Sequence, residues 1–439
     1  MAGRKGCYGE RLRSDRVMTT SVIHIATSPT GGAGIAARRL HNALRFIGVG
    51  SRMTVARGGE SEGDIVQFSR AAHKLSVMDR IVARRIKRER RMTSKTVSRK
   101  LAYFSDDRVP GPDRLAARPW TDVLNLHWVA GFLDYGKFFP TVREGQPLVW
   151  TLHDMAPMTG GCHYAMDCDR FTERCGACPL LGSTAEGDLT RRIHRRKAAA
   201  LSRLRPETTR IVAPSRWLAG EAQRSSLLGQ FEVEVIPNGL DVDIFQPRDR
   251  GVARDMLGLP RDGLVLLFVA ESVNDYRKGF DLLQEALRGL GSEKNVTLAA
   301  LGGSGSDGLE DALALGRVDN AHIMSHIYSA ADMFVSPTRA DNLPNVLVEA
   351  MACGVPCVSF NVGGVPDVVR HEETGLLAPA EDVHVLREAI ERLLGDDGLR
   401  RRMGNKGREI AETEFSDRRV AARYKVLYEE LIAASKGAK

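Results

Sequence analysis

Residues 341–369 read DNLPNVLVEAMACGVPCVSFNVGGVPDVV, and the order of patterns in this stretch decides the fold class. Asp341 and Glu349 flank a short apolar run that begins a helical pattern. Pro344 suits the first turn of a helix, and Gly354 suits its end. An apolar strand and a Gly-Gly turn follow, so the stretch predicts a loop, a helix and a buried strand in series.

Short apolar runs alternate with helical patterns along the rest of the chain, which is typical of a parallel α/β sheet. The runs stop near residue 240 and then begin again, so we predict two doubly wound domains. Ligands bind beyond the carboxyl ends of such strands, and two facing sheets would enclose a central cleft. The predicted strands are 21–27, 51–56, 123–129, 147–154, 209–215, 232–239, 264–271, 296–303, 332–338 and 356–360.

The domain boundaries follow from the same pattern. The first residues are polar and have no apolar core, so we expect a disordered extension and no export signal. The final helix suits either domain, including a return to the N-terminal one. The predicted parts are the extension at 1–19, an N-terminal domain at 20–238 with a Cys-rich insertion at 160–182, a linker at 239–250, a C-terminal domain at 251–416 and the last helix at 417–439.

The chain carries a net charge of +8, and the basic excess is clustered. Residues 73–100 hold eleven basic residues against two acidic ones, and residues 191–205 add a second block. The blocks are either solvated helix faces or a surface for an anionic membrane or a phosphate-rich partner. They lack interleaved aromatic residues, so no nucleic acid partner is expected. No run approaches the roughly 20 apolar residues of a membrane span, so we expect a cytoplasmic protein, at most peripheral on the inner face of the membrane.

The carboxylates of Asp341 and Glu349 are expected at the carboxyl edge of the second sheet, because the strand at 332–338 ends just before them. Gly363 and Gly364 follow the next strand, where backbone N–H groups and a helix N-terminus can face an anion. Carboxylates accept hydrogen bonds from sugar hydroxyls, so this set suits a nucleotide sugar. The structural alternative is that Glu349 caps a helix and the glycines only make a turn.

Two further loops carry features that suit a phosphate. Arg277 and Lys278 follow a strand of the second sheet and could neutralise a diphosphate, although any exposed Lys-Gly pair looks similar. Gly31 and Gly32 open a helix after the first strand, where Gly32, Gly34 and Ala37 match a dinucleotide-type fingerprint. That fingerprint expects an acidic residue about 20 positions on. None is present at the end of the second strand, so a sugar or phosphate contact is favoured over NADP.

His127 and His153 end neighbouring strands of the first sheet. Each could be a core histidine with satisfied nitrogens, but their repeated position at the cleft edge favours contact with a ligand. Asp154, next to His153, would offer its carboxylate to a hydroxyl or phosphate of a donor sugar.

Cys162, Cys168, Cys175 and Cys178 form the densest cluster of one residue type in the chain. In a cytosolic protein this packing favours a structural zinc site over disulfides. The alternatives are free buried thiols or one disulfide pair, and His163 could replace one ligand.

Together these stretches resemble the GT-B glycosyltransferases of retaining family 4, over roughly residues 20–435. The resemblance is carried by TGGAGIAA, TLHDM, VAPSRWLA, VIPNGLDVDIF, RKGFDLL and the opening stretch, whose acid-x7-acid motif falls on Asp341 and Glu349. HDM followed by TGGCHY and a CGxCP motif is similar to a subgroup associated with bacterial exopolysaccharide and lipopolysaccharide assembly. The resemblance implies two Rossmann-like domains facing a central cleft.

The resemblance also implies roles for individual residues. Glu349 would bind the donor's ribose, Lys278 its diphosphate, and Asp341 and His153 the transferred sugar. The family usually has Glu in place of Asp341, which would shift the sugar preference here. Many members have Arg in place of Val273, and Arg277 or Arg317 would take over that contact with the diphosphate. The implied catalytic residues are His153, Asp341 and Lys278; the implied donor-binding residues are Glu349, Arg277, Asn342, Leu343, Gly363, Gly364 and Arg317; Gly31, Gly32 and His127 would line the cleft.

The predicted function is retaining transfer of a hexosyl unit from a nucleotide sugar to a glycan acceptor, lipid-linked, in bacterial surface polysaccharide synthesis. The expected partners are the donor, that acceptor and an anionic membrane surface. No cofactor is expected for catalysis. The alternatives are a GT-B sugar-nucleotide epimerase and a non-catalytic, zinc-stapled sugar-binding protein.

Overall fold

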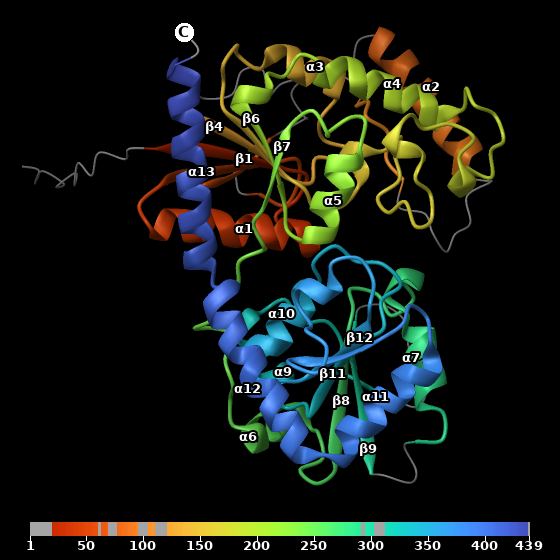
Figure 1. The fold of residues 1–439 in the computed structure, drawn as a ribbon, viewed down its shortest axis with the longest axis vertical. Helices are drawn as coiled ribbons and strands as arrows, with labels where there is room; N and C mark the ends of the chain where they lie inside the picture. The colour runs from red at the N-terminus through yellow and green to blue at the C-terminus, as the bar shows by residue number, and fades with distance from the viewer. Residues whose placement is uncertain are drawn as a thin grey trace, which may run out of the picture.

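The computed structural model describes residues 20–59, 63–68, 77–94, 104–109, 121–290, 295–302 and 312–437. The predicted extension at 1–19 and parts of the basic block at 73–100 lie outside these residues. The described chain forms two parallel sheets, each covered by helices and placed one above the other (Figure 1). This arrangement confirms the predicted fold class. No helix in the described part of the chain combines the length and apolar character that a membrane crossing needs.

The first sheet and the helices around it form what we call the N-terminal lobe, with strand order β3-β2-β1-β4-β5-β6-β7. Its strands are β1 (Ser21–Ala26), β2 (Gly50–Val55), β3 (Ile65–Gln67), β4 (Val123–Leu126), β5 (Leu148–Thr151), β6 (Thr209–Ala213) and β7 (Glu232–Val235). Its helices are α1 (Gly31–Phe46), α2 (Val77–Ser94), α3 (Tyr135–Phe138), α4 (Leu189–Leu201) and α5 (Arg216–Arg224).

The second sheet and its helices form the C-terminal lobe, with strand order β10-β9-β8-β11-β12-β13. The ten predicted strands are confirmed, whereas β3, β10 and β13 were not predicted. The strands of this lobe are β8 (Leu264–Val269), β9 (Val296–Leu301), β10 (Leu313–Ala314), β11 (Met333–Ser336), β12 (Cys357–Phe360) and β13 (Gly375–Ala378). Its helices are α6 (Arg250–Leu257), α7 (Phe280–Leu287), α9 (Ala321–Ser329), α10 (Asn345–Ala352), α11 (Val383–Gly395) and α12 (Asp397–Glu414).

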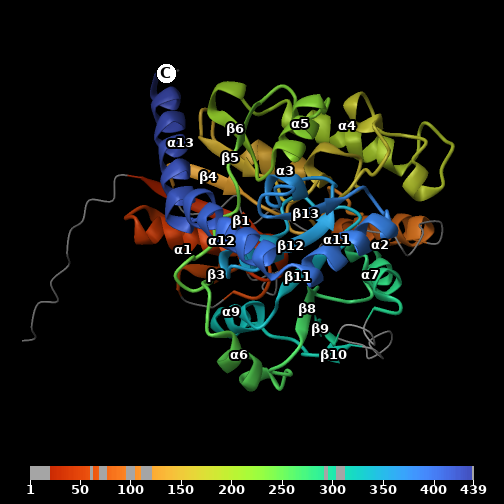
Figure 2. The same ribbon diagram turned by 60° about the horizontal axis from the view of Figure 1, so that its bottom comes forward.

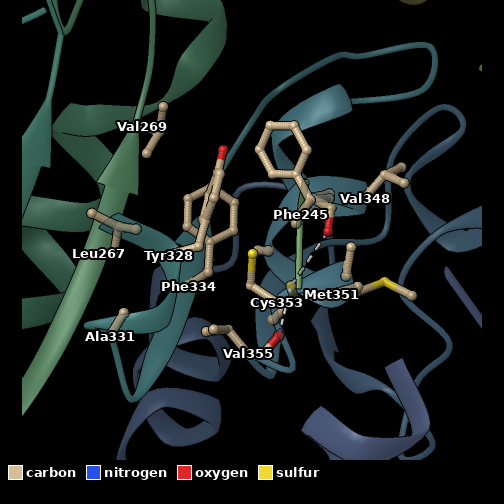
Figure 3. Close-up of a cluster of buried hydrophobic side chains, with 14 of the residues drawn as sticks. Phe245, Leu267, Val269, Tyr328, Ala331, Phe334, Val348, Met351, Cys353 and Val355 are labelled. Carbon is tan, nitrogen blue, oxygen red and sulfur yellow. Dashed lines mark hydrogen bonds between the residues drawn. The ribbon is translucent and has the colours of Figure 1, made fainter. Parts of the chain in front are cut away.

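The core of the C-terminal lobe is packed around Tyr328 of α9 (Figure 3). The Tyr328 ring centroid lies 5.7 Å from that of Phe334 in β11 and 6.4 Å from that of Phe245, which lies between β7 and α6. Val348 and Met351 of α10 belong to the same cluster. This packing holds α10, and therefore Glu349, against the sheet.

The last helix, α13 (Asp417–Gly437), leaves the C-terminal lobe and packs beside α1 on the N-terminal lobe (Figures 1 and 2). Its side chains enter a core shared with β1 and β4. The hydroxyl of Tyr428 accepts a 2.7 Å hydrogen bond from Asn125, and that of Tyr424 pairs with Thr151 at 3.0 Å. The apolar side is made by residues at helical spacing, namely Val420, Tyr424, Leu427, Tyr428 and Leu431.

Candidate active site

Asp341 lies on the loop after β11, at the carboxyl edge of the second sheet, and is buried. Its Oδ2 accepts hydrogen bonds from Lys278 Nζ at 2.7 Å and from Arg277 Nη1 at 2.9 Å. Burial alone would raise the pKa of Asp341, but the two cations outweigh burial and hold the pKa at about 2. The Asp341 carboxylate is therefore charged at neutral pH and gathers both cations at one point.

Two glycines let the backbone close around this cluster. Gly279 follows Lys278 with φ of +71°, and a Cβ there would lie 1.9 Å from the carbonyl oxygen of Pro337. Gly364 packs on the loop after β11, where a Cβ would lie 1.6 Å from the carbonyl oxygen of Asn342. A side chain fits at neither position, which explains the Lys-Gly pair and the Gly-Gly turn in the sequence.

The carboxylate of Glu349 is held from both lobes. Its Oε1 accepts a 2.6 Å hydrogen bond from Arg39 of α1, and its Oε2 accepts a 2.9 Å hydrogen bond from the Tyr328 hydroxyl. Helix α10 begins at Asn345, and its N-cap residue, Pro344, provides no side-chain cap. Glu349 therefore caps no helix terminus in the described structure, and its carboxylate sits between the lobes.

Further hydrogen bonds join the lobes around this point. Asn345 of α10 donates to the carbonyl oxygen of Gly32 at 3.0 Å, and Ser215 donates to the side-chain oxygen of Asn342 at 2.7 Å. Thr30, at the N-cap of α1, makes no side-chain cap, so its hydroxyl leaves the first N–H groups of α1 uncapped. Gly31, with φ of +72°, starts this helix at the lobe boundary.

The predicted histidines do lie together. Nδ1 of His127 is 3.1 Å from Nε2 of His153, and Nε2 of His127 is 2.9 Å from Nδ1 of His24 in β1. His127 is almost fully buried, whereas His153 is only half-buried. His24 was not predicted, because one histidine inside an apolar strand looks like an ordinary core residue.

Two neighbouring side chains that we expected to contact a ligand already have partners within the N-terminal lobe. The Asp154 carboxylate accepts hydrogen bonds from Trp128 at 2.7 Å and from the backbone of Ala156 at 2.8 Å, and it pairs with His163 at 2.5 Å. Its carboxylate therefore already has three partners within the N-terminal lobe, and its contact with a sugar hydroxyl stays a prediction. Both ring nitrogens of His163 are also engaged, by Asp154 and Ser105, so His163 is not placed to replace a cysteine as a metal ligand.

Two of the predicted donor-binding residues bring no side chain to this cluster. The Leu343 side chain is buried in the hydrophobic core, so only its backbone faces the loop. Arg317 is exposed and pairs with Asp319 at 3.2 Å. The structure brings together Asp341, Lys278, Arg277, Asn342, Gly363 and Gly364 on one loop system, with Glu349 on the helix that follows it.

Tyr164 of the Cys-rich insertion was missed by the sequence analysis. The Arg277 guanidinium lies 5.2 Å from the centroid of the Tyr164 ring. An aromatic face at this distance stabilises a cation. The insertion of the N-terminal lobe thus reaches the cation cluster of the C-terminal lobe.

The four predicted cysteines are free thiols, and all four line one small cavity. The sulfur of Cys175 accepts a 3.1 Å hydrogen bond from the backbone N–H of Gly160. Burial raises the pKa of Cys175 to about 11 and that of Cys162 to about 12. In the described residues, however, no three Cys, His, Asp or Glu side chains are grouped closely enough to hold a metal ion. The side chains as placed converge but do not complete a zinc site.

Comparison with known proteins finds glycosyltransferases and related synthases. The family model for group 1 glycosyl transferases matches residues 263–396. D-inositol 3-phosphate glycosyltransferase of Frankia alni is 33% identical over 309 residues, which cover 64% of this chain and 68% of that protein. N-acetyl-alpha-D-glucosaminyl L-malate synthase of Bacillus anthracis is 26% identical over 220 residues, which cover 47% of this chain and 56% of that protein.

Among solved structures, sucrose-phosphate synthase of Thermosynechococcus elongatus superposes with a TM-score of 0.66 at 21% identity, covering 94% of this chain and all of that one. The fold is therefore GT-B, two Rossmann-like domains that face each other. The chain belongs to the group 1 glycosyltransferases, and it is a transferase.

Proposed function

We propose that the enzyme moves a hexosyl unit from a UDP- or GDP-sugar to a lipid-linked glycan, with retention of anomeric configuration, in bacterial surface polysaccharide synthesis. The observation that carries the proposal is the pairing of Lys278 and Arg277 on one buried carboxylate beside the lobe boundary. Nε of Arg277 is buried and has no partner within the described residues. A diphosphate oxygen would supply that missing acceptor.

The other polar groups suit the remaining parts of a nucleotide sugar. Glu349 would accept hydrogen bonds from the ribose hydroxyls, as carboxylates do. The uncapped N-terminus of α1 would face the diphosphate or the sugar, because helix N-terminal N–H groups favour anions and oxygen-rich ligands. Asp341 and His153 would lie against the transferred sugar.

The proposed reaction exchanges one bond to the anomeric carbon for another on the same face. The bond from that carbon to the diphosphate oxygen breaks, and the bond to the acceptor oxygen forms. The acceptor's proton passes to the leaving phosphate oxygen. Lys278 and Arg277 would stabilise the charge that develops on the diphosphate, and loss of one such group typically costs about 10²–10³-fold in kcat.

The proposed acceptor side is the N-terminal lobe. Helix α2 exposes Arg80, Arg84, Arg85, Lys87 and Arg88. Val77 and Ile81 of the same helix are 67% and 52% exposed, so apolar and basic groups share its surface. This combination suits an anionic membrane surface that presents a lipid-linked acceptor.

The second basic block, residues 191–205, contributes less to a membrane-binding surface than its sequence suggested. Lys197 is buried and donates to the carbonyl oxygens of Ala156 and Thr159. Arg196 is paired with Asp106 and Asp107. These two cations hold the lobe together, so we assign membrane attraction to α2. Flotation with vesicles containing anionic lipid should show binding at low salt that weakens at high salt, and no flotation at low salt would contradict this part.

The donor is tested by a thermal-shift panel of UDP-, GDP- and ADP-sugars, in which the true donor raises Tm selectively. Transfer is then assayed with a lipid-linked saccharide, with inositol phosphate and with L-malate, because the relatives carry the last two in their names. Retention is read from the anomeric configuration of the product by NMR. No shift with any nucleotide sugar would contradict the proposal, whereas sugar conversion without any acceptor would favour the epimerase.

We also propose that Cys162, Cys168, Cys175 and Cys178 bind a structural zinc ion. The small cavity that all four cysteines line supports this proposal. Zinc binding would bring the four sulfur atoms closer together than they lie in the described residues of this structure. Zinc prefers four ligands in a tetrahedron and would hold a loop that carries little core of its own. Metal analysis of purified protein should find about one zinc per chain. Metal-free protein with four titratable thiols would contradict this proposal and leave the transferase proposal intact.

A further inference from the structure

Three histidines form a continuous hydrogen-bonded row across the N-terminal sheet. His24 lies in β1, His127 follows β4 and His153 follows β5, and these strands are neighbours in the order β1-β4-β5. The contacts join Nδ1 of His24 to Nε2 of His127 at 2.9 Å, and Nδ1 of His127 to Nε2 of His153 at 3.1 Å. The row begins in the core, at His24, and ends at the half-buried His153.

All three rings are neutral at physiological pH. Burial lowers the pKa of His24 and of His127 well below the usual value, and it lowers the pKa of His153 to about 4. Each ring therefore carries one N–H, and each contact needs one donor and one acceptor nitrogen. A ring that accepts through one nitrogen must donate through the other. The row can therefore be protonated in only two ways, with every N–H on Nδ1 or every N–H on Nε2.

The inner end of the row decides between these two states. Nε2 of His24 is buried and has no hydrogen-bond partner within the described residues. If every N–H were on Nε2, that nitrogen would be a buried donor without an acceptor, and orphaned buried N–H groups are rare in proteins. If every N–H is on Nδ1, the inner end is a bare acceptor, and Nδ1 of His153 becomes a donor at the outer end.

The outer end is the one that a ligand can use. Within the described residues, Nδ1 of His153 takes part in no hydrogen bond, whereas its Nε2 is occupied by His127. Sugar hydroxyls and phosphate oxygens both accept hydrogen bonds, so a donating Nδ1 suits either. A bare Nδ1 would instead accept a proton, which is the role of a general base.

We propose that His24 and His127 hold His153 as its Nδ1–H tautomer, so that His153 donates a hydrogen bond to an oxygen of the bound nucleotide sugar. His24 and His127 act through His153 and are positioning residues. The role assigned to His153 rests on the proposed function, but the tautomer itself is a property of the ligand-free protein.

The test is the ¹⁵N NMR spectrum of ligand-free full-length protein labelled at histidine nitrogens. The spectrum of H153Q identifies the His153 signals by their loss. We expect a protonated Nδ1 and a bare Nε2 for His153 at neutral pH. A proton on Nε2 of His153, or a charged ring, would overturn the proposal, whether or not the enzyme transfers sugar. If the tautomer is as expected and no nucleotide sugar is used, only the proposed function fails.

A matched pair of variants separates positioning from mere packing. The amide nitrogen of asparagine stands at the same bond distance from Cα as Nδ1 of histidine, so H24N keeps a donor to Nε2 of His127. The carboxylate of H24D has the same shape but only accepts, so His127 must donate to it through Nε2 and accept through Nδ1 from His153. We expect H24N to retain the Nδ1–H tautomer of His153, and H24D to switch it to Nε2–H. In H24D, kcat should fall about tenfold with a smaller change in donor KM, as for one lost hydrogen bond to the ligand. An unchanged His153 tautomer in folded H24D would contradict the role of His24. If H24D does not fold, the wild-type spectrum and H24N still decide.

Discussion

The guanidinium of Arg39 in the N-terminal lobe donates a 2.6 Å hydrogen bond to the Glu349 carboxylate in the C-terminal lobe. Both side chains are largely buried, with 16% and 10% of their surface exposed. In the ligand-free protein, the carboxylate that we assign to the ribose is thus occupied by a cation from the opposite lobe. Donor binding would replace this ion pair by hydrogen bonds from ribose hydroxyls.

Replacement of Arg39 therefore tests the use of Glu349. In R39A, the Glu349 carboxylate keeps its hydrogen bond from Tyr328. Arg39 no longer competes with the ribose hydroxyls for that carboxylate. An ion pair of this kind is worth about 1 kcal/mol, so we expect the donor Kd to fall about fivefold in calorimetric titration. R38A changes an exposed arginine on the same helix and should leave Kd unchanged. Weaker donor binding in R39A would show that Arg39 itself contacts the donor.

The Asp341 cluster should make a pH-dependent contribution to stability. Because the folded-state pKa of about 2 lies below the usual value of 3.8, the contribution is complete above about pH 4 and is lost as pH falls toward 2. From this shift, we expect D341N to lower the free energy of unfolding by about 2 kcal/mol at pH 6. The difference between D341N and wild type should shrink below pH 4, as measured by denaturant titration. D319N, at an exposed ion pair, should show no such trend, and a constant difference for D341N down to pH 2 would contradict this account.

Gly279 should be essential for the placement of Lys278. The Cβ introduced by G279A would meet the carbonyl oxygen of Pro337, so the backbone that carries Lys278 must move. A displacement near 1 Å in a catalytic group can cost about a hundredfold in kcat, and we expect a loss of that order in steady-state kinetics. G220A lies in the interior of α5, where the new Cβ would meet no atom outside the helix's own backbone within 4 Å, and should keep full activity. Near-normal activity of G279A would mean that Lys278 is not where the chemistry occurs.

Tyr164 should contribute to donor affinity through Arg277. Removal of its ring in Y164A takes away a cation–π contact worth about 1 kcal/mol, so we expect donor KM to rise about fivefold. Y164F keeps the ring and should change KM much less. M166A alters an exposed residue of the same insertion and serves as the control. Equal effects of Y164A and M166A would assign the change to the loop as a whole.

Much of the architecture could be predicted from apolar periodicity, because strands buried on both faces appear as continuous apolar runs. The three strands that were missed are short, and β3 and β10 are largely exposed, so their pattern is weak. Asp341, Lys278 and Arg277 could be predicted because each follows a strand at the same sheet edge. Arg39 and Tyr164 could not, because contacts between lobes depend on how two folded units meet, which local patterns do not encode. Tyr328 could not, because its contact with Glu349 joins two helices that only the folded core of the C-terminal lobe brings together.

Asp154 shows a second limit of prediction from sequence. Its position after β5 predicted a ligand contact, but three hydrogen bonds within the N-terminal lobe already use its carboxylate. Position at a strand end indicates where a side chain lies and not which partner it takes.

The most direct test of the account is a crystal structure of the enzyme with the nucleotide sugar that gives the largest thermal shift. We predict the diphosphate within hydrogen-bond distance of Lys278 and Arg277, the ribose on Glu349 in place of Arg39, and the sugar beside Asp341 and His153. A structure in which the donor binds elsewhere, with the Arg39–Glu349 pair intact and the cations still bound only to Asp341, would contradict it.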